Sequence, residues 1–201
     1  MTVVKKSFKK TLTDLSSKES MLRLVLAVAK KAGVKIAIGG GIAVNAHGFR
    51  RETDDVDAFF HYDDQHKVLR AMHRLADNFV LEEIDPSQWI AVPPGAEANE
   101  RIDLMFASGD PEESAIEMTE RRNYHGIAAP VFPVDMLVIS KFIAERNEIK
   151  DILDIYTLHQ RGAFDIEEIT HRLRQMGLIE DAEQFPKFMA SLETLIANRR
   201  G

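Results

Sequence analysis

The hydrophobic periodicity of the chain changes near residue 130. Before that point, short apolar runs typical of buried strands, such as 34–38, 55–62 and 101–108, lie between segments of helical period. From Val134 onward, every periodic segment is helical. Strands and helices followed by helices alone are typical of an α+β or α/β core that continues into a helical region. We therefore expect a core over residues 1–130 and a C-terminal helical region over residues 131–201.

Local signals predict the individual elements of the core. Ser17 and Gly33 delimit a helix, and Asp110 with Pro111 opens another helix over 110–121. The other expected elements are a short helix over 41–48, a helix over 63–79, strands over 79–84 and 89–93, a turn over 93–100, and irregular chain or a short strand pair over 126–133.

Composition excludes several classes of protein. The net charge of −6 gives no general field for binding nucleic acid, so we expect no extensive nucleic-acid surface. No cysteine is present, which excludes disulfides, thiol catalysis and zinc–thiolate sites and suits a reducing cytosol. The apolar runs are too short to span a bilayer, and no apolar run follows the N-terminal lysines as in a signal peptide. We expect a cytoplasmic protein without a membrane partner.

Two aspartates precede and begin an expected strand. Asp55 and Asp57 are two residues apart, so on a strand their side chains share one face. Adjacent carboxylates repel each other unless a cation lies between them, and Mg²⁺ is a usual partner of such oxygens. Asp103, which alternates with apolar residues in the expected strand 101–108, is the best candidate for a third carboxylate. The alternative is that Asp55 and Asp57 are solvated or capping residues.

Glycines 39 to 41 lie between an apolar run and an expected short helix. Backbone amides in such a turn can hold a phosphate, because no Cβ atom blocks the approach. Neither the Walker A pattern nor G-x-G-x-x-G fits the residues that follow Gly41, and a Gly-Gly pair alone is more often a simple turn. Arg51 and Thr53 add a cation and a hydroxyl just before the aspartates; Arg51 could contact a phosphate or pair with a neighbouring aspartate.

Taken together, residues 40–57 form the string G-G-x-A-x-x-x-H-G-x-x-R-x-T-x-D-V-D. This string resembles the first motif of the nucleotidyltransferase superfamily that shares its fold with DNA polymerase β. It is most similar to the small branch that includes AbiEii-type abortive-infection toxins and antibiotic nucleotidyltransferases. Residues 132–158 resemble a helical motif of the same branch, which places Lys141, Arg146, Lys150, Asp151 and Asp154 on helical faces.

The resemblance implies a fold and a mechanism. The fold would be a small mixed β-sheet flanked by helices, so that residues 1–130 form the catalytic core. Gly40 and Gly41 would bind the triphosphate of a nucleoside triphosphate such as ATP. Asp55, Asp57 and Asp103 would bind two Mg²⁺ ions, and Asp103 would act as the base toward an acceptor hydroxyl. Arg51, Thr53 and Lys141 would complete the nucleotide site, and pyrophosphate would leave.

Two other functions remain open at this point. The first is a catalytically silent nucleotide-binding protein in a toxin–antitoxin or regulatory pair. The second is an unrelated hydrolase or phosphatase with an Asp-x-Asp pair, which would leave the glycines unexplained. The acceptor of a transferase could be a protein hydroxyl, the end of a tRNA or a small antibiotic-like molecule of the aminoglycoside or lincosamide type.

Overall fold

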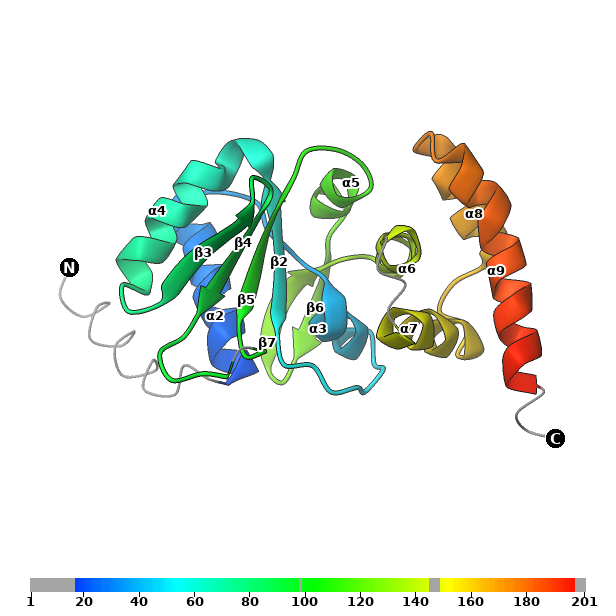
Figure 1. Ribbon diagram of the computed structural model, residues 1–201, viewed down its shortest axis with the longest axis horizontal. Helices are drawn as coiled ribbons and strands as arrows, with labels where there is room; N and C mark the ends of the chain where they lie inside the picture. Colours follow the sequence, from blue (N-terminus) through cyan, green and yellow to red (C-terminus); the bar gives the residue numbers. More distant parts are fainter. Residues whose placement is uncertain (1–16, 98, 145–148, 198–201) are drawn as a thin grey trace. The chain divides into compact units, whose positions relative to one another are not determined.

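The fold is built from a mixed sheet with helices, followed in sequence by helices alone. The computed structural model describes residues 17–97, 99–144 and 149–197. The chain divides into two compact units, residues 1–132 and 133–201 (Figure 1). The expected α+β class, with a mixed sheet flanked by helices and a helical C-terminal region, is confirmed.

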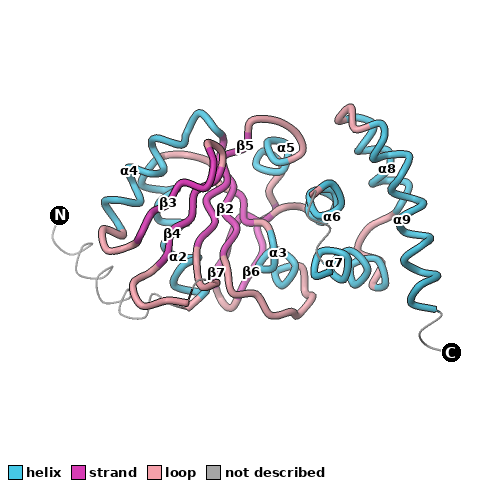
Figure 2. The backbone as a smooth tube through the Cα atoms, viewed as in Figure 1, coloured by secondary structure: helices cyan, strands magenta, loops and turns pink. Residues whose placement is uncertain are grey.

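The first unit contains a seven-stranded sheet in the order β3-β4-β5-β2-β1-β7-β6 (Figure 2). Its strands are β1 (Ala37–Ile38), β2 (Val56–His61), β3 (Val80–Asp85), β4 (Gln88–Val92), β5 (Ile102–Ala107), β6 (Glu120–Tyr124) and β7 (Ile127–Val131). β2 pairs with β5 in parallel, as β1 does with β7, and the other neighbouring strands are antiparallel. The sheet is therefore mixed.

The helices of this unit follow the local signals of the sequence. They are α2 (Lys18–Ala32), α3 (Gly40–Ala46), α4 (Gln65–Leu75) and α5 (Glu112–Glu117), with a 3₁₀ turn, η1 (Tyr62–Asp64), before α4. The Ser17 hydroxyl accepts a hydrogen bond from the Ser20 amide, and Gly33 ends α2 with a left-handed backbone, φ 69°. The predicted helix over 17–33 is thus confirmed with its caps.

One face of the sheet is covered by helices. Every second residue of β2, namely Val56, Ala58 and Phe60, is fully buried on this face, and α2 packs against both β2 and α4. The residues between them, Asp57 and Phe59, point to the opposite face, because side chains alternate along a strand. The buried face fixes the strand, and the opposite face carries its polar side chains.

A polar cluster at the end of β2 anchors α5. His61 Nε2 lies 2.9 Å from Glu117 Oε1, and the Lys35 ammonium contacts the same carboxylate. The hydrogen bonds from Lys35 and then from His61 hold the pKa of Glu117 below its usual range. α5 is therefore tied to the end of β2 that lies away from Asp57.

The helix predicted over 110–121 is shorter than expected. α5 ends at Glu117, and residues Glu120–Tyr124 form strand β6, so the prediction was wrong over the last part of that segment. β6 forms a hairpin with β7 across His125 and Gly126, whose φ values are 47° and 82°. Positive φ at both central residues suits a two-residue hairpin turn. β6 is a polar edge strand, which has no apolar alternation to reveal it.

The second unit contains four helices among its described residues. These are α6 (Val134–Ile143), α7 (Ile149–Gln160), α8 (Ile166–Gln175) and α9 (Ile179–Ala197). Phe142 of α6 packs against Phe185 and Phe188 of α9, with ring centroids 5.0 Å and 5.3 Å apart. Arg172 of α8 pairs with Asp135 of α6 at 2.6 Å. In the described part of the chain, no helix has the length and apolar character needed to cross a membrane.

We predict that Phe60→Ala lowers the free energy of unfolding by about 3–5 kcal/mol, because Phe60 is fully buried and the substitution leaves a cavity beside Phe106. Urea unfolding followed by the fluorescence of Trp89, the single tryptophan, measures this for the unit that holds the sheet. Tyr62→Ala, at a position 42% exposed, is the control, with an expected change within about 0.5 kcal/mol. Equal losses in both variants would contradict the prediction.

Candidate functional site

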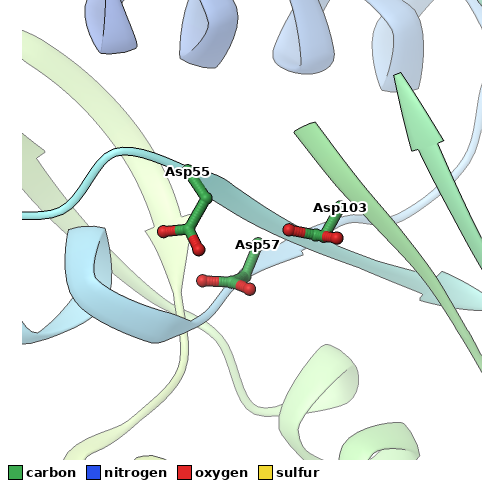
Figure 3. Close-up of side chains that lie close together, drawn as sticks. All are labelled: Asp55, Asp57 and Asp103. Atoms are coloured by element: carbon green, nitrogen blue, oxygen red, sulfur yellow. The ribbon is translucent and has the colours of Figure 1, made fainter. Parts of the chain in front are cut away.

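Three carboxylates meet on the face of the sheet opposite the helix-covered one. Asp55 directly precedes β2, Asp57 lies in β2, and Asp103 of β5 is the parallel neighbour of Asp57. One oxygen from each carboxylate lies within 4.8 Å of one oxygen from each of the others. Figure 3 shows the three side chains pointing toward a common space beside the two strands. The register of β2 against β5 therefore assembles the cluster that the sequence predicts.

Hydrogen bonds orient two of these carboxylates. The Thr53 hydroxyl donates to Asp55 Oδ1 at 2.9 Å, and Thr53 is only 5% exposed. Arg101 Nε donates to both oxygens of Asp103, at 3.2 Å each, and Gln88 Nε2 lies 3.4 Å from Asp103 Oδ1. Asp103 is 4% exposed, so Arg101 provides a positive charge next to a buried carboxylate. Thr53 orients the aspartate before the strand, and Arg101 orients the one on β5.

The glycines contact the same cluster. Gly40 has φ +52°, and a Cβ atom on it would lie 1.7 Å from Asp57 Oδ2. A Cβ atom on Gly41 would lie 2.5 Å from Thr53 Oγ1 and 3.0 Å from the Arg51 guanidinium carbon. All three distances are at or below the limit of real Cβ contacts, so only glycine fits at these positions without displacing a neighbouring side chain. The turn into α3 therefore lies directly against the carboxylate cluster.

The Asn45 side chain holds part of the loop between α3 and β2. Asn45 Oδ1 accepts a hydrogen bond from the Arg51 amide at 2.8 Å, and Asn45 Nδ2 donates to the Arg51 carbonyl at 2.9 Å. The Arg51 guanidinium donates to the Glu52 carbonyl at 2.9 Å and lies over Gly41. Asn45 thus places Arg51 beside the glycine turn.

The donor set of this cluster fits a divalent cation. Three carboxylates within one ion's reach repel each other, and a hard cation relieves that repulsion while accepting their oxygens as ligands. Asp55 and Asp57 are half-buried, so the space between them is open to solvent, and Mg²⁺ retains waters and phosphate oxygens as further ligands. Asp55, Asp57 and Asp103 could hold such an ion, and the amides of the first turn of α3 have no partners within that helix.

Lys141, predicted to contact a nucleotide, lies in the helical unit. Its ammonium is 2.6 Å from Asp151 Oδ1 and 2.8 Å from Asp154 Oδ2, and the side chain is 7% exposed. Both aspartates belong to α7, three residues apart, so Lys141 joins α6 to α7. A nucleotide contact through Lys141 stays a prediction. Arg146, the other basic residue of this motif, lies outside the described residues.

Three residues that support the candidate site were not predicted from the sequence. Arg101 and Gln88 hydrogen-bond to Asp103, and Asn45 holds the loop that carries Arg51. For Arg101 a signal was present, because residues two apart on a strand share a face, and Arg101 lies two before Asp103. No local signal identifies Gln88 or Asn45, since their contacts depend on a neighbouring strand and on the course of a loop.

Several solved structures resemble this fold. The antibiotic-resistance factor ANT(2'')-Ia aligns with a TM-score of 0.56 and 17% identity, over 92% of this chain and 98% of that chain. The lincosamide antibiotic adenylyltransferase LnuA aligns with a TM-score of 0.51 and 17% identity, over 71% of this chain and 96% of that chain. At these identities the likeness shows the fold alone.

The sequence itself identifies the family. Residues 23–194 match the family described as "Nucleotidyl transferase AbiEii toxin, Type IV TA system", and this match covers most of the chain. The chain therefore belongs to the AbiEii nucleotidyltransferase family, as the resemblance of residues 40–57 indicated. No curated protein matches the sequence.

We predict that Gly40→Ala destabilises the fold more than Gly48→Ala, by about 1–3 kcal/mol, because only the first variant brings a methyl group against Asp57. Both glycines have positive φ, +52° and +93°, so alanine strains the backbone at either position, and only the Gly40 variant adds a clash with Asp57. Urea unfolding followed by Trp89 fluorescence gives both values. Equal destabilisation would show that Asp57 can move aside at little cost.

We predict that Lys141→Met destabilises the helical unit by about 3–5 kcal/mol, because the ammonium that pairs with both Asp151 and Asp154 is lost from a largely buried position. Thermal unfolding followed by circular dichroism at 222 nm measures the loss. The matched control is Lys187→Met, an exposed lysine of α9, for which a change within about 0.5 kcal/mol is expected. A stable Lys141→Met protein with weakened nucleotide binding would instead favour a nucleotide contact.

Proposed function

We propose that this protein transfers a nucleoside monophosphate from a nucleoside triphosphate to an acceptor hydroxyl at Asp55, Asp57 and Asp103, with two Mg²⁺ ions. The observation that carries the proposal is the close approach of Gly40 to Asp57, because it brings the glycine turn and the three carboxylates of the family motif together in one place. Membership of a nucleotidyltransferase family supports the reaction type.

The carboxylates have separate roles in this proposal. Asp55 and Asp57 would hold the ions, and Asp103 on β5 would supply the third carboxylate. When bound, two Mg²⁺ ions neutralise charge on the attacking and leaving oxygens of an in-line displacement. Thr53 keeps the Asp55 carboxylate turned toward the site through its hydrogen bond, so less reorganisation is needed when the substrate arrives.

The glycine turn and Arg51 bind the triphosphate. The amides of Gly40 and Gly41 lie at the start of α3 and can donate to phosphate oxygens, because no Cβ atom stands between them and the site. Arg51 lies over Gly41 and supplies a fixed positive charge for the phosphates. Lys141 is a further candidate for a nucleotide contact from the helical unit.

Asp103 receives the proton of the acceptor hydroxyl. The acceptor oxygen forms a bond to the α-phosphorus as the bond from that phosphorus to the oxygen leading to the β-phosphate breaks, and pyrophosphate leaves. Arg101 donates to both oxygens of Asp103 and so holds this carboxylate in a fixed orientation. A protein hydroxyl, a tRNA end and an antibiotic-like compound are the candidate acceptors.

Relatives suggest two settings for this reaction. The family is named for toxins of type IV toxin–antitoxin systems, so a toxin role with a partner antitoxin is one setting. ANT(2'')-Ia has been solved with adenylyl-2''-tobramycin and LnuA with lincomycin, and modification of a small molecule is the other setting. The proposed metal and nucleotide site would be the same in both settings.

We predict that a nucleoside triphosphate with Mg²⁺ raises the melting temperature, and that EDTA abolishes the shift. At a ligand concentration of about 100 times Kd the stabilisation is about 2.7 kcal/mol. Asp57→Asn removes one of the three carboxylates proposed to hold the metal, so the shift in melting temperature should vanish. Labelling of an acceptor from α-³²P-labelled triphosphates should also fall. We expect a loss larger than the roughly 10–100-fold that follows when a residue that only hydrogen-bonds to a metal ligand is removed.

The matched control is Asp54→Asn. Asp54 is an exposed neighbour whose carboxylate lies 3.7 Å from the Lys18 ammonium, outside the cluster, so both the shift and labelling should persist. A wild-type protein that binds the triphosphate but labels no acceptor would favour a silent nucleotide-binding role. A wild-type protein that shows no shift would sink the proposed function.

A further inference from the structure

A row of aligned residues crosses four strands from the carboxylates to the sheet edge. Asp57 of β2 is opposite Asp103 of β5, Asp103 is opposite Ile90 of β4, and Ile90 is opposite Glu82 of β3. Residues opposite each other in a sheet point to the same face. Ile90 and Glu82 therefore extend the face that carries the carboxylates, at strand spacings of about 4.8 Å each.

This extension is accessible to solvent. Glu82 is exposed, Val80 is 62% exposed, and Gln88, Ile90 and Val92 are half-buried. The alternating residues of β5, such as Ile102 and Leu104, lie fully buried on the opposite face of the sheet. Exposed apolar side chains in contiguous positions beside a reactive site are typical of a binding surface.

The geometry of in-line transfer indicates on which side of the carboxylates the acceptor would bind. The glycine turn lies beside Asp57 on the β1 side of β2, whereas Asp103 lies on β5 at the other side. In-line displacement places the attacking oxygen opposite the leaving pyrophosphate. With the triphosphate at the glycines, the acceptor hydroxyl lies toward Asp103, and the strands beyond β5 are β4 and β3.

We propose that the exposed face of β4 and β3 beside Asp103 binds the acceptor, and that the acceptor is a hydroxyl compound carrying a cationic amine. This acceptor platform consists of Val80, Glu82, Gln88, Ile90 and Val92. The proposal rests on the proposed function and specifies the substrate class of that site.

The chemistry of the platform determines the acceptor class. Ile90, Val92 and Val80 offer an apolar surface to the body of a small molecule. Glu82 offers a carboxylate at the end of the row, and within the described part of the chain it forms no ion pair, so it is available to a ligand amine. The exposed carboxylate of Glu82 on this face repels the phosphates of an RNA acceptor.

The test uses tobramycin as the cationic probe, sucrose as a neutral polyol and unfractionated tRNA as the anionic alternative. Each is added to methyl-labelled full-length protein that carries Mg²⁺ and a non-hydrolysable α,β-methylene ATP. We expect tobramycin to shift the NMR signals of the Ile90 and Val92 methyl groups, with no shift from sucrose. Glu82→Lys should raise the Kd of tobramycin by about tenfold or more, because an ionic hydrogen bond is replaced by repulsion.

Glu83→Lys is the matched control. Glu83 is the next residue on β3, equally exposed, and is opposite Trp89 on the other face of the sheet, so its Kd should change by less than about twofold. Equal effects of both substitutions would overturn a specific role for Glu82. Shifts caused by tRNA and not by tobramycin would overturn the cationic class, and unshifted Ile90 and Val92 signals with tobramycin would overturn the platform.

The same samples separate this proposal from the proposed function. Thermal stabilisation by the ATP analogue and Mg²⁺ reports the nucleotide site alone. If the nucleotide stabilises the protein and tobramycin fails to bind, the platform is wrong and the transferase assignment survives. If the nucleotide itself fails to bind, both are overturned.

Discussion

The parallel pairing of β2 with β5 is the constraint on which the site depends. It places Asp57 beside Asp103, with carboxylate oxygens within 4.8 Å of each other. Two negative charges at this distance repel each other by roughly 1–4 kcal/mol, depending on the local dielectric constant. The same pairing buries Phe60 and Phe106 on the other face, and each fully buried side chain of this kind stabilises by about 1.5–3 kcal/mol. Apolar burial thus offsets the repulsion that the cluster carries without a cation.

The glycine turn has a steric reason that is independent of any phosphate. Gly40 and Gly41 are required because Asp57, Thr53 and Arg51 occupy the space where Cβ atoms would lie. The motif therefore combines two constraints, since the residues that must be small are also the ones whose amides border the carboxylates. This explains why a Gly-Gly pair and an Asp-x-Asp pair occur together in one motif, although thirteen residues separate Gly41 from Asp55.

Much of the fold was predictable because its signals are local. Ser17 and Gly33 cap α2 as expected, and the strands around Asp57 and Asp103 lie where their apolar alternation predicts them. β6 was missed because a polar edge strand has no such alternation, and its turn at His125–Gly126 gives only a weak signal. Lys141 could be recognised as a charge in an apolar helix, but its pairing with Asp151 and Asp154 depends on how α6 packs against α7.

The sequence by itself determined the family, the glycine turn, the three carboxylates and the change from a mixed sheet to helices. Each of these features follows from the spacing of residues within a motif or from the period of apolar residues within a segment. Only the tertiary structure decided that Asp103 is the neighbour of Asp57, that Arg101 and Gln88 support it, and that Ile90 and Glu82 continue the same row. Strand order and register set these contacts, because they arise from packing between segments that are distant in sequence.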